Sequence, residues 1–194
     1  MHLRALILPA AVGLLLAGCG DDGATPPPPE ESEETLDRLP DLPRGYEEFL
    51  NADVGVAFGR PPGWSAKAKG NVSTLVAPDG LVSATITIDR TDDALAGGPK
   101  DFATETAELL PSYEEPLAPG EAEPFEHPYQ GAVAEAEGVA ERSGVSQRVR
   151  VVVLERDGVA VVTAIIAENA REDAGAEARQ ALKAVATLRT RPPL

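Results

Sequence analysis

The sequence predicts an α+β domain in which a largely antiparallel sheet is sandwiched by helices. In several segments apolar residues occur at every second position, as in strands, and in two segments they recur with the 3.6-residue period of a helix. Turn residues separate neighbouring strand segments. Residues 159–166 of a strand expected at 159–168 are apolar on both faces, which indicates a central strand with cover above and below. Mixed order, short turns and a doubly covered strand together are typical of the α+β class.

The first half of the folded segment is expected to begin with a strand at residues 53–58. The motif R60-P-P-G-W64 ends this strand, because proline cannot donate a hydrogen bond to a sheet. Strands at residues 73–77 and 81–90 flank P78-D79-G80, which has the residue types of a tight turn.

A helix is predicted to begin near Pro99, since proline suits a first helical position and Asp101 suits the positive end of the helix dipole. The helix is expected to end before Pro111. Its inward side is predicted to carry Phe102, Thr106, Leu109 and Leu110.

Further strands are predicted at residues 123–128, 131–141, 145–156 and 159–168, and D157-G158 is the strongest hairpin signal in the chain. Residues 172–189 form a closing helix with acids early and bases late. The apolar stripe of this helix contains Ala174, Ala178, Leu182, Val185 and Leu188.

The N-terminus has the pattern of a bacterial export signal. Arg4 precedes an apolar run over residues 5–17, which is shorter than the ~20 residues of a membrane-spanning helix. The sequence L16-A17-G18-C19 resembles the lipobox of bacterial lipoproteins, which implies removal of residues 1–18 and acylation of Cys19. The chain has no second cysteine to form a disulfide. We therefore expect a lipid anchor in the cell membrane, on its extracytoplasmic face.

Residues 19–44 are predicted to be the lipidated cysteine and a disordered linker, because a tetraproline run and clustered acids leave little apolar surface to bury. Residues 45–191 form one domain-sized unit. The whole chain carries a formal net charge of −15. An acidic chain without a basic stripe is a poor candidate for binding nucleic acid, and its membrane affinity must come from acyl chains.

The order of these elements resembles a known fold. The F58-G-R-P-P-G-W64 segment, the mid-chain helix, the D157-G158 hairpin and the closing helix L182-K-A-V-A-T-L-R189 are similar to a PsbP-like α/β/α sandwich. With the lipobox, the chain resembles actinobacterial lipoproteins of the LpqN type. The resemblance implies an accessory or partner-binding module of the cell envelope, with no catalytic residue to transfer.

The residue inventory argues against most enzyme classes. Once residues 1–18 and acylated Cys19 are set aside, no thiol and only His127 remain for nucleophilic, redox or zinc chemistry. His127 lies between Glu126 and Pro128, which favours an exposed turn. No G-x-S-x-G elbow, P-loop or dinucleotide fingerprint is present. We expect no enzyme activity, no cofactor and no metal.

Two carboxylates share a predicted strand face, because Glu135 and Glu137 alternate with alanines. Next-but-one neighbours on a strand lie within ~7 Å, so the pair could serve as acid and base. An ordinary solvated strand face is the favoured interpretation.

Two other features leave alternatives open. Small side chains line one face of the strand at 131–141, where either a helix approaches closely or a groove holds an apolar ligand; the residues concerned are Ala132, Ala134 and Ala136. Trp64, Tyr46 and Phe49 belong either to the core or to a partner-binding patch. The leading hypothesis is a non-enzymatic envelope lipoprotein that binds a protein partner, and the alternative is a carrier of a lipid or other apolar envelope ligand.

Overall fold

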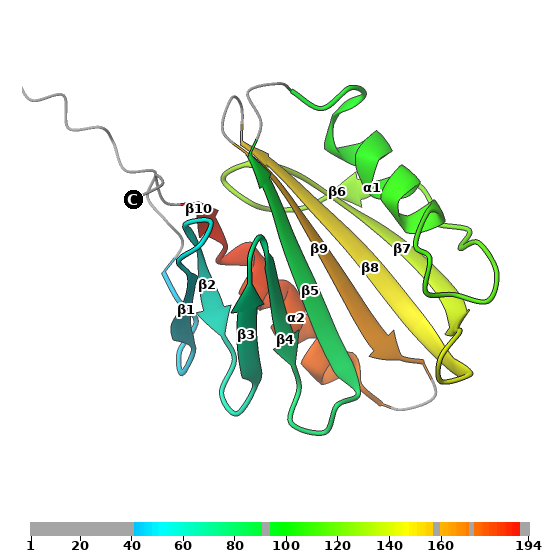
Figure 1. Cartoon of the computed structure of the whole chain (residues 1–194), viewed down its shortest axis with the longest axis horizontal. Helices are drawn as coiled ribbons and strands as arrows, with labels where there is room; N and C mark the ends of the chain where they lie inside the picture. Colours follow the sequence, from blue (N-terminus) through cyan, green and yellow to red (C-terminus); the bar gives the residue numbers. More distant parts are fainter. Residues whose placement is uncertain (1–40, 91–93, 157–159, 171–172, 191–194) are drawn as a thin grey trace, which may run out of the picture. The chain divides into compact units, whose positions relative to one another are not determined.

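The computed structural model describes residues 41–90, 94–156, 160–170 and 173–190, and these residues confirm the α+β class (Figure 1). Within them, ten strands form a seven-stranded and a three-stranded sheet, accompanied by two α-helices. All neighbouring strands pair antiparallel.

The larger sheet contains the longest strands. Its strands follow one another in space as β3 (Ser65–Lys69), β4 (Val72–Val76), β5 (Val82–Arg90), β9 (Ala160–Asn169), β8 (Val145–Arg156), β7 (Gln130–Ala140) and β6 (Glu123–Pro124). The fourth place belongs to β9, whose side chains enter apolar clusters on both faces. The prediction of a central, doubly covered strand is confirmed.

The smaller sheet joins segments from both ends of the folded domain. It consists of β1 (Glu47–Asn51), β2 (Val56–Arg60) and β10 (Arg189–Thr190), in the order β1-β2-β10. The strand expected at residues 53–58 begins only at Val56, because the chain turns through residues 52–55 with Gly55 at φ 64°.

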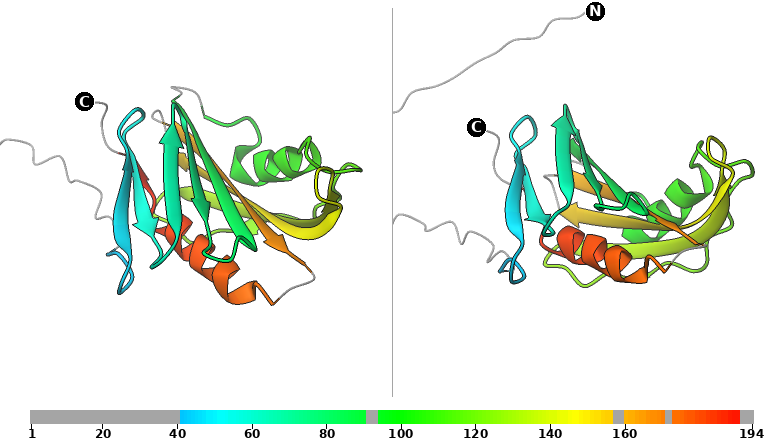
Figure 2. Two further views of the ribbon diagram at one scale, coloured as in Figure 1. Left: turned by 60° about the horizontal axis from the view of Figure 1, so that its bottom comes forward. Right: turned by 90° about the horizontal axis from the view of Figure 1, so that it is seen from below.

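The two helices cover opposite faces of the larger sheet (Figure 2). Helix α1 (Gly98–Glu108) packs on β7 and β8, whereas α2 (Gly175–Ala186) packs on β9, β5 and β2. The closing helix ends three residues earlier than expected, where the Thr187 hydroxyl donates to the carbonyl of Ala184 at 2.7 Å.

Helix α1 presents different residues to the sheet than its sequence predicted. Ala103 and Ala107 are buried, while Phe102, Thr106 and Leu110 are half-buried. The inward placement of Leu109 is wrong: this residue is the C-cap, and its side chain is 71% exposed. Small residues on the inner face let the helix lie close to the sheet.

Each face of the larger sheet has its own core. On the α2 side, Phe58, Trp64 and Leu188 join the inward residues of β5 and β9. On the α1 side, the helix alanines meet valines of β8 and alanines of β7. The predicted stripe of α2 is largely confirmed, with Leu182 half-buried and the others buried: Ala174, Ala178, Val185 and Leu188.

Two expected features have other outcomes. The strand predicted at residues 123–128 contains only Glu123 and Pro124, because the chain then leaves the sheet and His127 bonds elsewhere. The D157-G158 turn lies outside the described residues, although Arg156 and Ala160 pair directly on either side of it.

Candidate functional site

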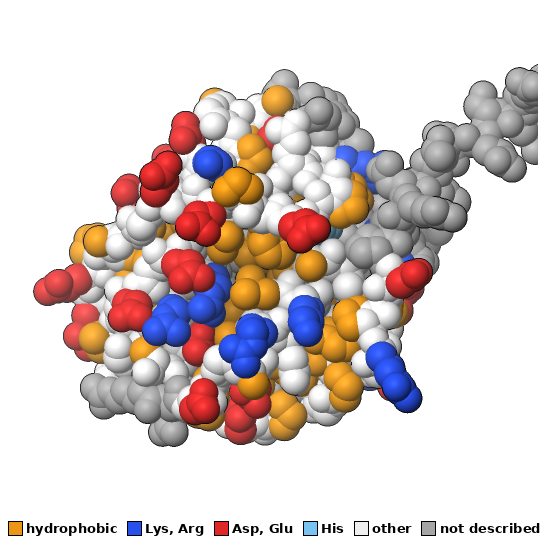
Figure 3. All heavy atoms as spheres, turned by 180° about the vertical axis from the view of Figure 1, so that it is seen from behind, with side chains coloured by type: hydrophobic (Ala, Val, Ile, Leu, Met, Phe, Trp, Pro, Cys, Tyr) orange, Lys and Arg blue, Asp and Glu red, His pale blue; other side chains and the backbone are white. Residues whose placement is uncertain are grey.

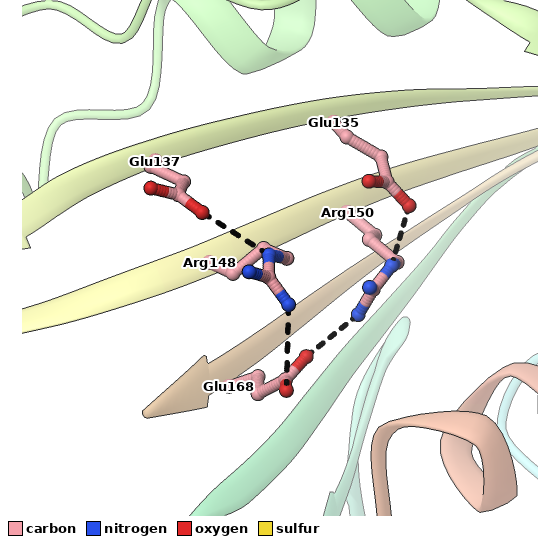
Figure 4. A network of polar contacts seen from close by, with 5 residues as sticks. All are labelled: Glu135, Glu137, Arg148, Arg150 and Glu168. Atoms are coloured by element: carbon pink, nitrogen blue, oxygen red, sulfur yellow. Dashed lines mark hydrogen bonds and ion pairs between the residues drawn. The ribbon is translucent and has the colours of Figure 1, made fainter. Parts of the chain in front are cut away.

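Five charged residues form a network on one face of β7, β8 and β9 (Figure 4). Strand register places Glu137 opposite Arg148, and Arg148 opposite Glu168. The neighbouring row places Glu135 opposite Arg150. Directly paired residues of antiparallel strands point to the same face, so the register alone brings these side chains together.

The arginines connect the three carboxylates. Arg150 donates from Nε to Glu135 at 2.6 Å and from Nη1 to Glu168 at 2.8 Å. Arg148 donates from Nε to Glu137 at 3.2 Å, and its Nη1 lies 3.8 Å from Oε1 of Glu168. Glu168 therefore contacts both arginines, whereas Glu135 and Glu137 each contact one. We call these five residues the ion-pair face.

Burial differs sharply across the ion-pair face. The side chain of Glu168 is 5% exposed and that of Arg150 is 14% exposed. Arg148 is 41% exposed, and the two β7 glutamates are 56% and 62% exposed. Burial acts to lower the pKa of Arg150, but its bonds and charge attraction to Glu168 and Glu135 outweigh this and raise the pKa. Arg150 is thus a fixed cation at the base of the face.

A shallow pocket of about 350 Å³, largely open to solvent, adjoins the exposed end of the ion-pair face. Its lining comes from Glu135, Ala136, Glu137, Arg148 and, across from the strands, Ala118. The loop that carries Ala118 runs along the outer edge of β7, where the amide of Gly120 donates to the carbonyl of Glu135 at 3.0 Å.

The structure decides what the two β7 carboxylates can do. Glu135 and Glu137 do share an exposed strand face, as expected. Each is bonded to an arginine and neither to the other carboxylate, so the arrangement supplies ion pairs and not an acid–base pair. Sequence reasoning did not include Arg148, Arg150 or Glu168, although the alternating R148-V-R150 was a usable signal.

The alanine face of β7 is packed against protein. Ala132, Ala134 and Ala136 are all buried, and Ala134 and Ala136 belong to the core beneath α1. A side chain at Gly138 would overlap Leu117, because the loop after α1 continues the same close packing. The groove for an apolar ligand is therefore absent from this face in the described residues, because the small side chains serve close approach of the helix and loop.

Of the three aromatic residues for which core and patch were both open, Trp64 belongs to the core, and Tyr46 and Phe49 pack half-buried against it. Trp64 is 4% exposed, and its Nε1 donates to Oε1 of Gln180 at 3.1 Å. Tyr46 is half-buried and donates to the carbonyl of Gln180 at 3.3 Å. The ring of Phe49 lies 5.2 Å from that of Phe58. These contacts fix the smaller sheet to α2 and leave Trp64 unavailable to a partner.

His127 is not the exposed turn residue that its neighbours suggested. Its Nδ1 accepts from the amide of Tyr129 at 3.0 Å, and its Nε2 lies 3.0 Å from the carbonyl of Leu188. An imidazole with Nδ1 as acceptor and Nε2 as donor is neutral. Burial lowers the pKa of His127, against the opposing effect of the bond to Leu188. Its role is to hold the loop before β7 to the segment before β10.

The described part of the chain contains no group of three or more His, Cys, Asp or Glu side chains that could hold a metal. Among the same residues, no helix has the length and apolarity needed to cross a membrane. Cys19 and the rest of residues 19–40, most of the segment predicted as a linker at 19–44, lie outside the described residues, so the predicted anchor has no structural account here.

Comparison with known proteins gives a fold but no family. No family model matches the chain, and no curated protein matches it. The Ran-binding protein Mog1p of Saccharomyces cerevisiae aligns with a TM-score of 0.51 at 15% identity, covering 75% of this chain and 95% of its own. LpqN of Mycobacterium tuberculosis, described as involved in cell envelope biogenesis, aligns with a TM-score of 0.50 at 15% identity. That alignment covers 76% of this chain and 91% of LpqN.

A third structure, from Bacteroides thetaiotaomicron, aligns with a TM-score of 0.51 at 12% identity. The match covers 76% of this chain but only 49% of that protein, so this chain spans about half of its length. At these identities the likeness shows a common α+β fold, of the kind expected from the PsbP-like resemblance, and nothing more specific.

Proposed function

We propose that this chain is a lipid-anchored protein of the cell envelope whose folded domain binds a partner protein and catalyses no reaction. The lipobox-like motif at Cys19 supports the anchor, and the distant fold likeness to LpqN is consistent with an envelope role. The observation that carries the binding function is the ion-pair face, whose β7 glutamates and Arg148 are left exposed by both helices.

The uncovered state of this face follows from where α2 lies. Helix α2 packs on β9, β5 and β2, and it does not extend over the part of β7 and β8 that carries Glu135, Glu137 and Arg148. Viewed from the α2 side, charged side chains of both signs gather around a hollow that shows hydrophobic side chains (Figure 3). Val133 and Leu182 are half-buried hydrophobic residues at the margin of the α2-side core.

The ion-pair face is suited to recognition because its geometry is already fixed. Glu168 and Arg150 are nearly buried and bonded to one another, which removes their freedom before any partner arrives. A face that is ordered in advance loses less conformational entropy on binding. Mixed charges on such a surface favour specificity and orientation over raw affinity.

The alternative function, a carrier of an apolar ligand, depended on the alanine face of β7 as its binding site. The alanine face that was to hold the ligand is filled by α1 and Leu117. We therefore propose partner binding alone.

The test is site-specific photo-crosslinking in cells. A photoreactive residue replaces Ser146, which lies on the ion-pair side of β8 opposite Val139. A matched residue replaces Glu108, which is exposed on α1 across the sheet. One dominant protein adduct from position 146 and none from position 108 supports the proposal. Adducts that are equal at both positions, or absent from both, refute it.

The anchor is tested separately. A Cys19→Ala variant should leave the membrane fraction and appear in the soluble or secreted fraction, because the acyl chains would be lost. If the variant stays with the membrane to the same extent as the parent, the anchor proposal is wrong.

A further inference from the structure

The last described residues of the chain have few backbone pairs. The ladder between β10 and β2 contains only Arg189 and Thr190, each with one partner on β2. Side chains from the loop before β7 and from the end of β8 supply further bonds to this segment. They form a cluster that we call the clasp, which consists of His127, Tyr129, Arg156, Leu188 and Thr190.

Thr190 is held from two sides within the clasp. Its amide donates to the hydroxyl of Tyr129 at 3.2 Å. Arg156 donates from Nη1 to the Oγ1 of Thr190 at 2.8 Å and to its carbonyl at 3.3 Å. The guanidinium of Arg156 also lies 5.6 Å from the centre of the Tyr129 ring. Tyr129 is 8% exposed and Thr190 is 6% exposed, so these bonds are shielded from water while the clasp is closed.

His127 closes the clasp through both of its ring nitrogens. Nδ1 accepts from the amide of Tyr129 at 3.0 Å, so Nε2 carries the proton and donates to the carbonyl of Leu188, also at 3.0 Å. The rings of His127 and Tyr129 lie edge to face, with their centres 4.7 Å apart. One orientation of the imidazole makes both bonds, so a turn of the ring breaks both.

A second proton on His127 is incompatible with this arrangement. A protonated imidazole is a donor at both nitrogens, so its Nδ1–H would face the N–H of Tyr129. Two donors cannot bond to each other, and a ring that turns away from the amide also loses Leu188. Burial lowers the pKa of His127, and the bond to Leu188 opposes this only in part.

The charged groups around the clasp do not compensate an imidazolium. Arg156 and Arg189 are cations, and Arg189 pairs with Glu48. Glu126 precedes His127 in the chain and is exposed, so it stays solvated. Among the described residues, no carboxylate forms an ion pair with the imidazole. A proton taken up by His127 therefore adds a positive charge that its surroundings disfavour.

We propose that His127 is a pH-sensitive latch, which in its neutral form closes the loop of residues 125–129 onto residues 188–190 and on protonation lets the two segments separate while the larger sheet stays folded. This inference is independent of the partner-binding proposal. Above pH 6.5 the imidazole is neutral and the clasp is closed. As the pH falls from 6.5 through the lowered pKa, the opening equilibrium should rise by up to about tenfold per pH unit, because opening takes up one proton.

The test is amide exchange of the full chain in detergent, followed residue by residue with NMR. Protection is measured against an unstructured peptide at the same pH. The amides of Tyr129 and Thr190 report on the two sides of the clasp, because they donate to His127 and to the Tyr129 hydroxyl. Both should have the same protection, below that of the central amides of β8 and β9, since a local opening costs less than global unfolding. Both should lose up to about tenfold of it per pH unit on acidification from pH 6.5.

Two variants separate the latch from a general loss of stability. His127→Gln has no group that takes up a proton in this range, so the pH dependence of both amides should vanish. Tyr129→Phe keeps the imidazole and the amide that donates to it but removes the hydroxyl. In this variant the Thr190 amide should lose its protection, while the amide of residue 129 keeps its pH dependence.

Three results would overturn the inference. Protection of Tyr129 and Thr190 equal to that of the central amides would mean that they exchange only through global unfolding. Different responses of these two amides to pH in the parent chain would mean that the bond to His127 breaks without opening the clasp. A pH dependence that persists in His127→Gln would assign the proton to another group.

Discussion

The ion pair between Arg150 and Glu168 offers the sharpest test of how the domain is held together. Replacing Arg150 with Met keeps an unbranched apolar stem but removes the cation that lies 2.8 Å from Glu168. Glu168, at 5% exposure, then remains as a buried carboxylate with its main partner gone. Burying an unpaired charge is among the most destabilising changes a single substitution can make.

The structure sets the size of the effect. Breaking a buried ion pair costs about 3–5 kcal/mol, and Arg148 at 3.8 Å retains part of the compensation, so we expect about 2–3 kcal/mol for Arg150→Met. The matched control Arg148→Met removes a 41% exposed arginine from a 62% exposed glutamate and should cost under about 1 kcal/mol. The lost contact between Arg150 and Glu135 adds little to the free-energy cost of Arg150→Met, because Glu135 is 56% exposed and stays solvated.

Urea unfolding of residues 20–194 measures the difference. With a slope of about 2 kcal/mol/M, Arg150→Met should lower the urea midpoint by about 1 M or slightly more, and Arg148→Met by less than about 0.5 M. The double variant Arg150→Met/Glu168→Leu should regain most of the loss, because no buried charge is left. Equal midpoints for the two single variants, or a double variant less stable than Arg150→Met, would refute the reasoning.

Three further changes probe other contacts. Gly138→Ala should lower the unfolding free energy by about 1–3 kcal/mol in urea, because the new Cβ overlaps Leu117; no loss would show that the loop yields freely. Burial lowers the pKa of His127, so its neutral form stabilises the native state above pH 6.5 and this stability is lost as pH falls from 6.5 through the lowered pKa. The midpoint temperature of thermal unfolding should therefore fall as the pH is lowered from about 7 to about 5, and His127→Gln should reduce this fall. The same fall in the variant would contradict the bond to the Tyr129 amide. Thr187→Val should cost about 1–3 kcal/mol by calorimetry, because the buried amide that donates to its hydroxyl at 2.7 Å loses its acceptor; a cost near zero would mean that another acceptor replaces it.

The long strands could be predicted from the sequence because their apolar pattern is local. Residues 145–156 were expected as a strand and form β8 with the same bounds, and the strand expected at 81–90 differs from β5 by one residue. Edge strands carry weaker patterns. The sequence SAKAK of β3 has no β-branched residue and is mostly exposed, so only its pairing with β4 makes it a strand.

The ion-pair face could be predicted in part. Alternation placed Glu135 and Glu137 together, and pairing counted outward from the turn at residues 141–144 gives Arg148 and Arg150 as their partners. Which sheet face α2 leaves uncovered depends on tertiary packing, and the sequence pattern contains no signal for it. His127 shows the same limit, because its partner Leu188 lies 61 residues away.

The smaller sheet is the part of the domain that a pull on the N-terminal segment would load. The chain reaches the domain through β1, which is paired with β2 over five residues, while β7 belongs to the far half of the larger sheet (Figures 1 and 2). If the domain is held by a membrane anchor at one end and a partner at the other, tension arrives first at β1. Such tension would load the five-residue pairing of β1 with β2 directly, whereas the network between Arg150 and Glu168 lies on the other sheet.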